Sequence, residues 1–480
     1  MNQSESIARP PILLELGMIF PSLALWSNRD PEDALGRIDR ALNDRNHRLS
    51  AGLSVTHRFE QIRGALAVSQ GHGKYLRVRH VVESCAAIPE TLRRGCLAVM
   101  TGEQRHCGEI AVLVSDLAEI QAAVVEQLKC EAGKYVDRVL AVAVCDPGIW
   151  DRDFDGKISY APFCDATRLA ELSGVTVIDA FPSRDLAVGG LGQQLESLPY
   201  WILFGDRDPK VASVHRTLVE VGEECVGYLL PPSDGLDSEL PGLRIARTLG
   251  TASLDEVIRR NDGKAKIVME QESGLAEGSL IPELQQRMQA AVLREANSNE
   301  QARATSVQSP SGTESVATIN ACMVEEMQTC LNHDSSNIVD VLYTGLQVVV
   351  DQSVEQMKKF GFEGIGQQPA GPTQAGQVLV ASSVQYQSCL IGMLQKSFPR
   401  STVVSSSTSG FDQSALPAVV AAVLGLFNID QMPSNIPWLT GADCQRILGR
   451  LTPGRPSNWC QLVRVMADFQ PAPMKLKDAI

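Results

Sequence analysis

Short apolar runs alternate with amphipathic stretches along the chain from residue 64 onward. Runs rich in β-branched residues and bounded by turn residues predict strands, and apolar residues at helical spacing predict helices. On this basis strands are predicted for residues 139–144, 175–178, 217–221, 226–230, 377–380 and 402–404, and helices for 167–172, 338–360, 388–394 and 416–427. Alternation of strands and helices is typical of an α/β protein.

The length of the chain and one polar stretch indicate how these elements are divided. A chain of 480 residues is too long for one compact core and suits two α/β lobes with extensions. We predict an N-terminal extension over residues 1–60, a first lobe over 61–210 and a second lobe over 211–470. Residues 296–314, rich in Ser, Gln, Asn and Thr, are predicted to be a linker inside the second lobe.

Charge and cysteine usage exclude several classes of protein. The formal net charge of −13 disfavours a nucleic-acid partner, because an acidic surface repels phosphate backbones. The 12 cysteines contain no Cys-x-x-Cys pair and lie in apolar segments, which predicts reduced cysteines, a cytoplasmic protein and no metal site. Residues 11–26 are apolar but contain Glu15, and they are too short for a membrane span, so no membrane association is expected.

The segment 181–195, FPSRDLAVGGLGQQL, carries the strongest candidate chemistry. Asp185 follows the predicted strand 175–178, and strand ends are where α/β proteins bind ligands. A carboxylate there can serve as a general base, and the glycines after it let a ligand approach the backbone. The alternative is a surface Asp185 paired with Arg184 and followed by a glycine-rich turn.

The same segment resembles the signature D-F-R-x-R-D-x-A-x-G-G-x-G-A-P-L of the anhydro-N-acetylmuramic acid kinases. The second Asp of that signature, which is the family's catalytic base, falls on Asp185. Residues 165–174 (DATRLAELSG) are similar to the family's G-D-P-x-x-I-A-E-x-T-G, and residues 432–453 (MPSNIPWLTGADCQRILGRLTP) to its L-P-x-N-x-P-S-V-T-G-A-x-x-x-x-x-L-G-x-I-x-P. With weaker matches between them, the resemblance covers about residues 61 to 455, and the C-terminal motif is the most specific.

The resemblance implies both a fold and a reaction. The fold is two ribonuclease-H-like lobes around a central cleft, as in sugar kinases, Hsp70 and actin, with Asp185 at the wall of the cleft. The reaction is ATP-dependent phosphorylation, with hydrolytic ring opening, of 1,6-anhydro-N-acetylmuramic acid in cell-wall recycling. It implies ATP and Mg²⁺ as cofactors, an amino sugar as the small-molecule partner and a possible homodimer. The residues implied at the sugar site, besides Asp185 as the base, are Arg184, Gly189, Gly190, Gly192 and Asp165.

Departures from the family pattern gather in the phosphate-binding loops. The opening motif G-x-M-S-G-T-S-x-D-G is placed on residues 67–74 (AVSQGHGK), where no Asp stands and only Gly71, Gly73 and Lys74 are candidates to hold an anion. The second phosphate loop is placed on residues 220–226, where Glu223 and Glu224 would repel phosphate. Two hypotheses follow: a divergent kinase whose activity is weakened or lost, or a catalytically inactive pseudokinase that binds a ligand or a partner protein.

Overall fold

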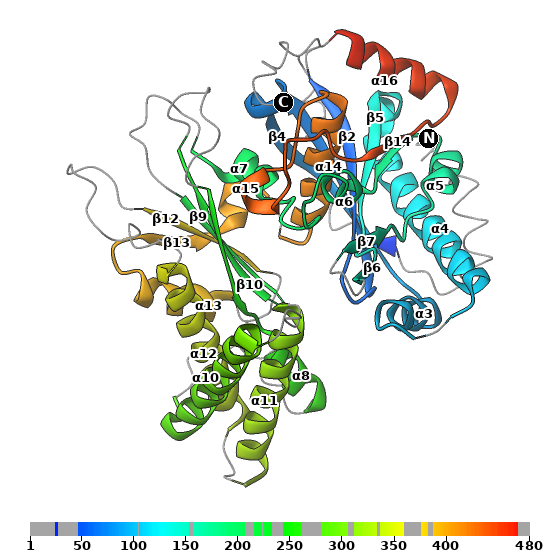
Figure 1. Cartoon of the computed structure of the whole chain (residues 1–480). Helices are drawn as coiled ribbons and strands as arrows, with labels where there is room; N and C mark the ends of the chain where they lie inside the picture. Colours follow the sequence, from blue (N-terminus) through cyan, green and yellow to red (C-terminus); the bar gives the residue numbers. More distant parts are fainter. Residues whose placement is uncertain are drawn as a thin grey trace, which may run out of the picture. The chain divides into compact units, whose positions relative to one another are not determined.

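Figure 1 shows the computed structural model of the chain, which divides into two compact units. Unit 1 comprises Met1–Leu203 and Gly410–Ile480, and unit 2 comprises Phe204–Ser409. The structure describes residues 25–26, 47–103, 105–152, 157–206, 216–222, 224–232, 243–261, 280–305, 312–333, 337–359, 376–382, 387–411 and 413–468.

Unit 1 is built on a seven-stranded sheet in the order β1-β4-β3-β2-β5-β8-β14. β2 pairs antiparallel with β3 on one side and parallel with β5 on the other, and β5 continues the parallel part with β8. A separate hairpin, β6 with β7, connects β5 to the next helix. The strands are β1 (Leu25–Trp26), β2 (Arg48–Val55), β3 (Gln61–Gln70), β4 (Arg77–Ala87), β5 (Val139–Cys145), β6 (Ile149–Arg152), β7 (Ile158–Ala161), β8 (Thr176–Asp179) and β14 (Arg450–Thr452).

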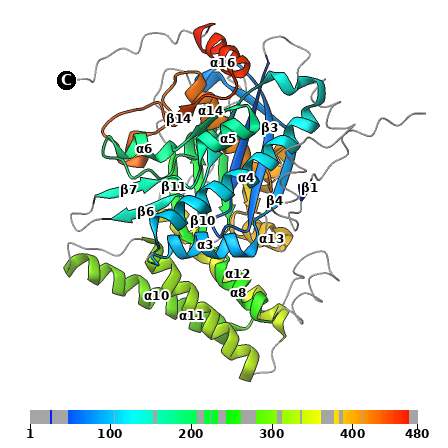
Figure 2. The same ribbon diagram turned by 90° about the vertical axis from the view of Figure 1, so that its right-hand side faces the viewer.

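Two helices pack closely on the sheet of unit 1, one against β3 and β4 and the other against β2 and β5 (Figures 1 and 2). A Cβ atom at Gly64 would lie 2.6 Å from Val124 of α4, and one at Gly52 would lie 1.9 Å from the carbonyl oxygen of Ala418 in α14. These two glycines therefore set how near the helices approach. The helices of unit 1 are α3 (Glu90–Met100), α4 (Cys107–Ala132), α5 (Ala166–Ser173), α6 (Phe181–Leu186), α7 (Ser197–Phe204), α14 (Leu416–Ile429), α15 (Pro437–Thr440) and α16 (Pro456–Asp468).

Unit 2 has a five-stranded sheet in the order β11-β10-β9-β12-β13. β9 pairs antiparallel with β10 and parallel with β12. The strands are β9 (Arg216–Val221), β10 (Glu224–Leu230), β11 (Arg244–Leu249), β12 (Gln377–Ser382) and β13 (Thr402–Ser405). The helices are α8 (Ala252–Arg260), α10 (Pro282–Thr305), α11 (Gly312–His333), α12 (Ile338–Lys359) and α13 (Gln387–Ser397).

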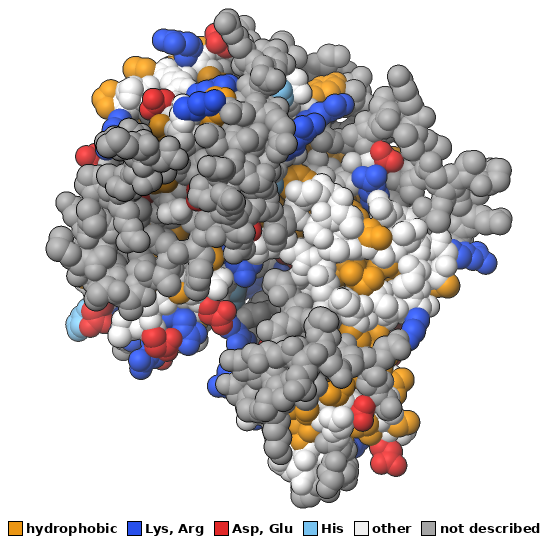
Figure 3. Space-filling model, turned by 180° about the vertical axis from the view of Figure 1, so that it is seen from behind, with side chains coloured by type: hydrophobic (Ala, Val, Ile, Leu, Met, Phe, Trp, Pro, Cys, Tyr) orange, Lys and Arg blue, Asp and Glu red, His pale blue; other side chains and the backbone are white. Residues whose placement is uncertain are grey.

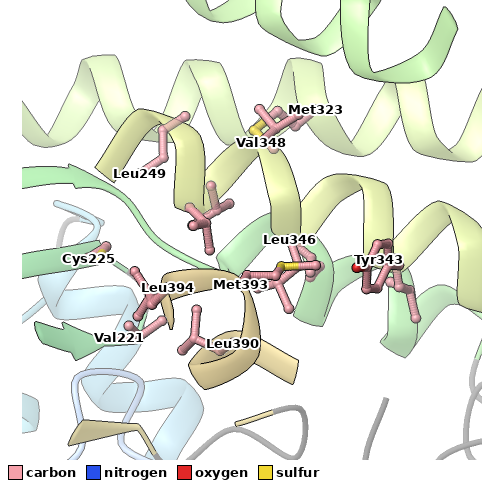
Figure 4. Packing of buried hydrophobic residues seen from close by; sticks show 14 of the residues in the cluster. Val221, Cys225, Leu249, Met323, Tyr343, Leu346, Val348, Leu390, Met393 and Leu394 are labelled. Atoms are coloured by element: carbon pink, nitrogen blue, oxygen red, sulfur yellow. The ribbon is translucent and has the colours of Figure 1, made fainter. Parts of the chain in front are cut away.

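The core of unit 2 lies between its sheet and α12, with α11 and α13 completing it. Leu346 of α12 and Met393 of α13 lie together there, and Leu394 of α13 lies near Val221 and Cys225 of the sheet (Figure 4). Aliphatic side chains and methionines make up most of this cluster, so unit 2 is held together by apolar burial.

The two sheets share one topology. In the first sheet the edge strands β1 and β14 flank a five-stranded part, β4-β3-β2-β5-β8, which corresponds to the second sheet, β11-β10-β9-β12-β13. If the five strands of each are numbered in chain order, they lie side by side in the order third, second, first, fourth and fifth. In both, the first three strands are antiparallel and the next two are parallel to the first. This is the ribonuclease-H-like arrangement, and it confirms the predicted fold class of two such α/β lobes.

The units differ from the boundaries expected from the sequence. The expected N-terminal extension over residues 1–60 contains β2, which lies between β3 and β5 in the sheet of unit 1. The chain also returns to unit 1 at Gly410, because α14 packs on β2 and β5 and β14 pairs with β8. The expected linker over residues 296–314 is largely helical, since α10 continues to Thr305 and α11 begins at Gly312.

Candidate functional site

Asp185 lies in α6, immediately after β8, and is completely buried. One carboxylate oxygen accepts a hydrogen bond from the backbone N–H of Gly192 (2.9 Å), and the other accepts one from the Asn435 side-chain amide (2.8 Å). The Asn435 amide oxygen in turn accepts from the backbone N–H of Arg446 (2.6 Å). The carboxylate therefore joins two segments that are far apart in the sequence, 181–195 and 432–453. This burial differs from the alternative of a surface Asp185 paired with Arg184.

The three glycines after Asp185 are explained by this local structure. A Cβ at position 190 would lie 2.1 Å from the Asp185 carboxylate, so only glycine fits there. Gly189 and Gly192 adopt φ angles of +81° and +65°, which side chains rarely adopt. The segment is therefore glycine-rich because it wraps tightly around a buried carboxylate.

Arg184 and Asp165 take separate places in unit 1. The Arg184 side chain is exposed, and both oxygens of the neighbouring Asp185 are bound elsewhere, so the expected Asp185–Arg184 pair is not formed. Asp165 caps the N-terminus of α5, where its carboxylate accepts from the backbone N–H of Arg168 (2.9 Å). Capping by Asp is a common stabilising role that requires no ligand.

The candidate cofactor residues Gly71, Gly73 and Lys74 lie in the connection between β3 and β4. This connection is at the amino ends of the parallel strands β2 and β5, because Gln70 and Ser69 come last in the antiparallel β3 and Ser69 pairs with Arg48, the first residue of β2. Ligands in α/β folds bind at the opposite, carboxyl ends. The expected phosphate loop is therefore at the wrong edge of the sheet.

A buried carboxylate of the protein occupies the polar groups of this connection. The backbone N–H of Gly73 donates to Asp430 (3.0 Å), and His72 Nδ1 lies 2.9 Å from the same carboxylate. Arg48 forms an ion pair with Asp430 and donates to the carbonyl oxygen of Gly71 (2.6 Å). A pocket of about 640 Å³ lies beside it, lined by Arg48, Gln70, Gly71, His72, Tyr75, Arg77, Val465 and Asp468.

The turn between β2 and β3 corresponds better to the family's opening motif, and our sequence analysis missed it. Gly52 and Glu60 stand eight residues apart, as do the first Gly and the Asp of G-x-M-S-G-T-S-x-D-G. The turn lies at the carboxyl end of β2, the edge where ligands bind. The spacing of one glycine and one acidic residue was the only available signal, because the residues between them do not match.

The backbone of this turn is engaged internally. The Thr56 hydroxyl accepts from the backbone N–H groups of Glu60 (2.9 Å) and Gln61 (3.1 Å), and the Thr56 carbonyl accepts from Phe59 (2.8 Å). Phe59 is buried against Phe163, with ring centroids 5.0 Å apart. Phosphate loops bind through free, converging N–H groups. This turn, with three of its N–H groups directed to Thr56, does not fit a nucleotide phosphate.

The corresponding turn of unit 2 connects β9 to β10. Glu224 lies 3.5 Å from Arg247 of β11, and the N–H of Gly222 donates to the carbonyl oxygen of Glu224 (3.0 Å). Glu223 lies outside the described residues. A half-buried carboxylate at this turn disfavours a phosphate group.

A group of titratable side chains lies at the carboxyl ends of β5 and β8. Asp146 accepts from the backbone N–H of Phe163 (3.0 Å), while its other oxygen is buried without a partner, and burial raises the pKa of Asp146 to about 6. Burial also raises the pKa of Asp179, although its ion pair with Arg450 (2.6 Å) acts in the opposite direction. The pKa of the Cys164 thiol is raised by burial, so this thiol is protonated at neutral pH.

The described residues show neither a metal-binding cluster nor a membrane-spanning helix. They contain no group of three or more His, Cys, Asp or Glu side chains placed to hold a metal ion. No helix among them combines the length and apolar character that a bilayer crossing requires. On the face shown in Figure 3, described basic and acidic side chains are interspersed and form no continuous basic stripe.

Together, the two ribonuclease-H-like sheets and the joined motifs define a protein of the two-lobed class to which sugar kinases belong. The sequence model of the family described as anhydro-N-acetylmuramic acid kinase matches residues 65–217 and 329–454. The chain belongs to this family.

Individual relatives are distant. The chain is 22% identical to the anhydro-N-acetylmuramic acid kinase of Nitrosomonas europaea and 25% identical to that of Nitrosospira multiformis, in each case over 366 residues, 76% of this chain and 89% of the relative. It is 29% identical to that of Variovorax paradoxus over 151 residues, which are 31% of this chain and 39% of the relative. Among solved structures, a ROK family glucokinase from Streptomyces griseus, in complex with glucose and AMPPNP, aligns with a TM-score of 0.29 and 13% identity over 78% of this chain and 98% of its own.

Proposed function

We propose that this chain is a family member that has lost phosphotransfer and binds a small-molecule amino sugar without turning it over. The observation that carries the proposal is the state of Asp185. Its side chain is completely buried, and both of its oxygens already accept hydrogen bonds from Gly192 and Asn435. A general base must reach the proton that it removes, within hydrogen-bond distance or through one water.

The nucleotide side of the site supports the same proposal. The N–H groups of the β2–β3 turn are directed to Thr56, and the N–H of Gly73 is directed to Asp430. Phosphoryl transfer depends on positioning and on electrostatic stabilisation of the transferred group, so a protein without phosphate clamps has little catalytic power. Among the described residues, neither of these two turns fits the phosphates of ATP with Mg²⁺.

What favours sugar binding is the direct packing of the two best-matching motifs against each other. Besides the Asp185–Asn435 hydrogen bond, the N–H of Leu191 donates to the carbonyl oxygen of Thr440 (2.8 Å), and the N–H of Asp443 donates to Val188 (2.8 Å). These contacts support a sugar side that is held together by both motifs, in contrast to the phosphate loops, whose residues depart from the family pattern. A homodimer remains a prediction that light scattering tests.

Calorimetry with the purified chain tests the proposal. We expect no heat of binding for ATP with Mg²⁺, and measurable binding of 1,6-anhydro-N-acetylmuramic acid alone. We also expect no phosphorylated sugar in the presence of both. Micromolar affinity for ATP, or a phosphorylated product, would show that the chain is an active kinase.

The variant Asp185→Asn separates a structural from a catalytic carboxylate. An Asn amide group would place a donor against either the Gly192 N–H or the Asn435 amide, so we expect the variant to lose about 1 to 3 kcal/mol of unfolding free energy. The exposed Asp443→Asn, in the adjoining segment, is the matched control and should change stability by less than about 0.5 kcal/mol. Unchanged stability together with lost turnover in Asp185→Asn would restore the catalytic interpretation.

A further inference from the structure

Trp150 is an exposed aromatic residue at the ligand edge of unit 1. It lies in β6, five residues after the last residue of β5, whose carboxyl end lies beside that of the parallel strand β8. Its relative exposure is 36%, although tryptophan is usually largely buried. Ligands in α/β folds bind at this edge of the sheet.

The indole ring is held in place from three sides. Its Nε1–H donates to the carbonyl oxygen of Pro147 (2.7 Å). The Tyr160 ring packs on it with centroids 4.7 Å apart and an interplanar angle of 58°. The far end of the ring lies against Gly192, where a Cβ would come within 3.0 Å of Trp150 Cη2. A side chain fixed in this way loses little conformational entropy when a ligand covers it.

Other exposed groups belong to the chain segments on either side of Gly192, which the ring contacts, and to the helix bonded to them. Leu191 is 43% exposed, and its N–H donates to Thr440 of the short helix α15, which carries Trp438 with 49% exposure. The polar side chains of Arg184 and Gln193, in the same motif segment, are exposed as well. Small-molecule sites combine aromatic surface with a few polar groups in this manner. A sugar ring matches the combination, because it presents apolar C–H groups on its faces and hydroxyl groups around its rim.

We propose that Trp150 is the stacking residue on which this chain binds the ring of an amino sugar. The ring's C–H face covers the exposed part of the indole, and the hydroxyl and acetamido groups reach the polar side chains beside it. This inference rests on the proposed function, since it names the residue that makes the principal contact with the sugar. The position falls in the segment 145–150, where the family's G-S-H-G-Q-T motif offers no aromatic residue, so the contact is specific to this chain.

Calorimetry and tryptophan fluorescence with 1,6-anhydro-N-acetylmuramic acid as the probe test this role. Trp150→Ala should weaken binding at least tenfold, because the apolar face is lost. Trp150→Phe keeps a ring and should bind within about threefold of the parent, but the sugar-induced fluorescence change should disappear. The matched control Tyr75→Ala removes another exposed aromatic ring of unit 1, in the β3–β4 connection at the opposite edge of the sheet. It should bind the sugar within about twofold of the parent and keep the fluorescence change.

The outcomes separate the two proposals. Equal sugar affinity for the parent and Trp150→Ala overturns the role of Trp150 and leaves the proposed function standing. Phosphorylation of the sugar by the parent overturns the proposed loss of phosphotransfer and leaves the role of Trp150 standing. A parent that binds no sugar overturns both, and a partner protein then becomes the expected occupant of this surface. If Trp150→Ala does not fold, Trp150→Leu takes its place, because it keeps apolar volume without a ring and should lose the same affinity.

Discussion

Units 1 and 2 share one sheet topology but bury different kinds of side chain. Among the described residues of unit 2, the buried polar side chains are serines and threonines: Thr217, Thr251, Ser253, Thr344, Ser353, Ser382, Ser401 and Ser406. Unit 1 buries titratable and charged groups: Arg48, His80, Glu83, Glu119, Glu126, Glu131, Asp179, Asp185 and Asp430. Buried charges are costly unless they are paired, so each of those in unit 1 depends on a specific partner.

The match to the family model also differs between the units. The model does not match residues 218–328, which lie entirely in unit 2 and include β10, β11, the helices α8 and α10 and most of β9 and α11. An apolar core tolerates extensive substitution as long as volume and pattern are kept. A network such as Asp185 with Gly192 and Asn435 does not, because each member leaves an unpaired group when another changes. The family model thus leaves a stretch of unit 2 unmatched, as it also does residues 1–64 and 455–480 of unit 1.

The largest effect is expected from removing the Asp430 carboxylate of unit 1. Asp430→Ala leaves Arg48, which is 9% exposed, without its partner, and also frees the N–H of Gly73. Breaking a buried ion pair costs about 3 to 5 kcal/mol of unfolding free energy. Urea denaturation measures this loss, and the exposed Asp443→Ala should stay within about 0.5 kcal/mol of the parent. A loss below about 1 kcal/mol would mean that the buried charges of unit 1 are not the source of its constraint.

A substitution that leaves a cavity in the core of unit 2 should lower the unfolding free energy somewhat less than Asp430→Ala does. Leu346 of α12 is completely buried in the core of unit 2, so Leu346→Ala should lose about 3 kcal/mol. The loss should be independent of pH between 5 and 8, because the core that surrounds Leu346 contains no buried carboxylate among the described residues. Leu293→Ala, whose side chain is 56% exposed in α10, serves as the control. If the stability loss of Leu346→Ala depended strongly on pH, buried titratable groups would not be confined to unit 1 as proposed.

The variant Asp146→Asn should reveal how the stability of unit 1 depends on pH. Because burial raises the pKa of Asp146 from 3.8 to about 6, the folded state binds the proton more tightly than the unfolded state. The stability that this proton contributes is fully present below about pH 4 and is lost as pH rises through about 6. Asn keeps an acceptor for the Phe163 N–H without a charge, so the variant should be more stable than the parent at pH 7.5, by at most about 3 kcal/mol.

The measurement is the difference in unfolding free energy between Asp146→Asn and the parent at pH 4.5 and 7.5. Carboxylates that titrate in both proteins cancel in this difference. Asp151→Asn, an exposed position in β6, should show no such difference. A variant that is less stable than the parent at pH 7.5 would mean that the Asp146 carboxylate gains more from a partner than it loses by burial.

The smallest effects are expected from replacing one glycine in each unit by alanine, and the two changes in unfolding free energy should have opposite signs. Gly190→Ala in unit 1 places a Cβ 2.1 Å from the Asp185 carboxylate and should lose about 1 to 3 kcal/mol. Gly392→Ala in α13 of unit 2 meets no atom within 4 Å and should gain about 0.5 to 1 kcal/mol, since alanine is the better helix former. The thermal unfolding midpoint of each variant measures its change in stability. If both midpoints shift in the same direction, the proposed difference between the two units is wrong.

Local pattern in the sequence was sufficient for much of the fold. The runs 139–144 and 338–360 correspond to β5 (Val139–Cys145) and α12 (Ile338–Lys359), because β5 is one continuous apolar run and α12 carries apolar residues at helical spacing. It failed for α4, where Glu119, Gln121 and Glu126 are buried beside leucine and valine and obscure the helical period. It also failed for residues 296–314, where polar composition indicated a linker although most of the stretch is helical.

The candidate site was predicted only in part, because only its contiguous motifs can be recognised in the sequence. The sequence identified the segments 181–195 and 432–453 as related to one family, and these segments lie together in the structure. It placed the phosphate loop on residues 67–74, although the turn after β2 lies at the correct edge of the sheet. Which edge a loop occupies depends on strand direction and pairing, and neither is encoded within the loop itself.

The sequence by itself therefore determined the α/β class, the two-lobed fold and the family, because each follows from periodicity or from motifs that are contiguous in the chain. Only the tertiary structure decided that β2 is an interior strand of unit 1, that the chain returns to unit 1 after Ser409, and that Asp185 is buried. Asp185 and Asn435 are 250 positions apart, and their hydrogen bond removes a carboxylate from solvent that the motif alone presents as a base. Burial and hydrogen bonding are set by residues distant in sequence, and they decide what the carboxylate at position 185 can do in this protein.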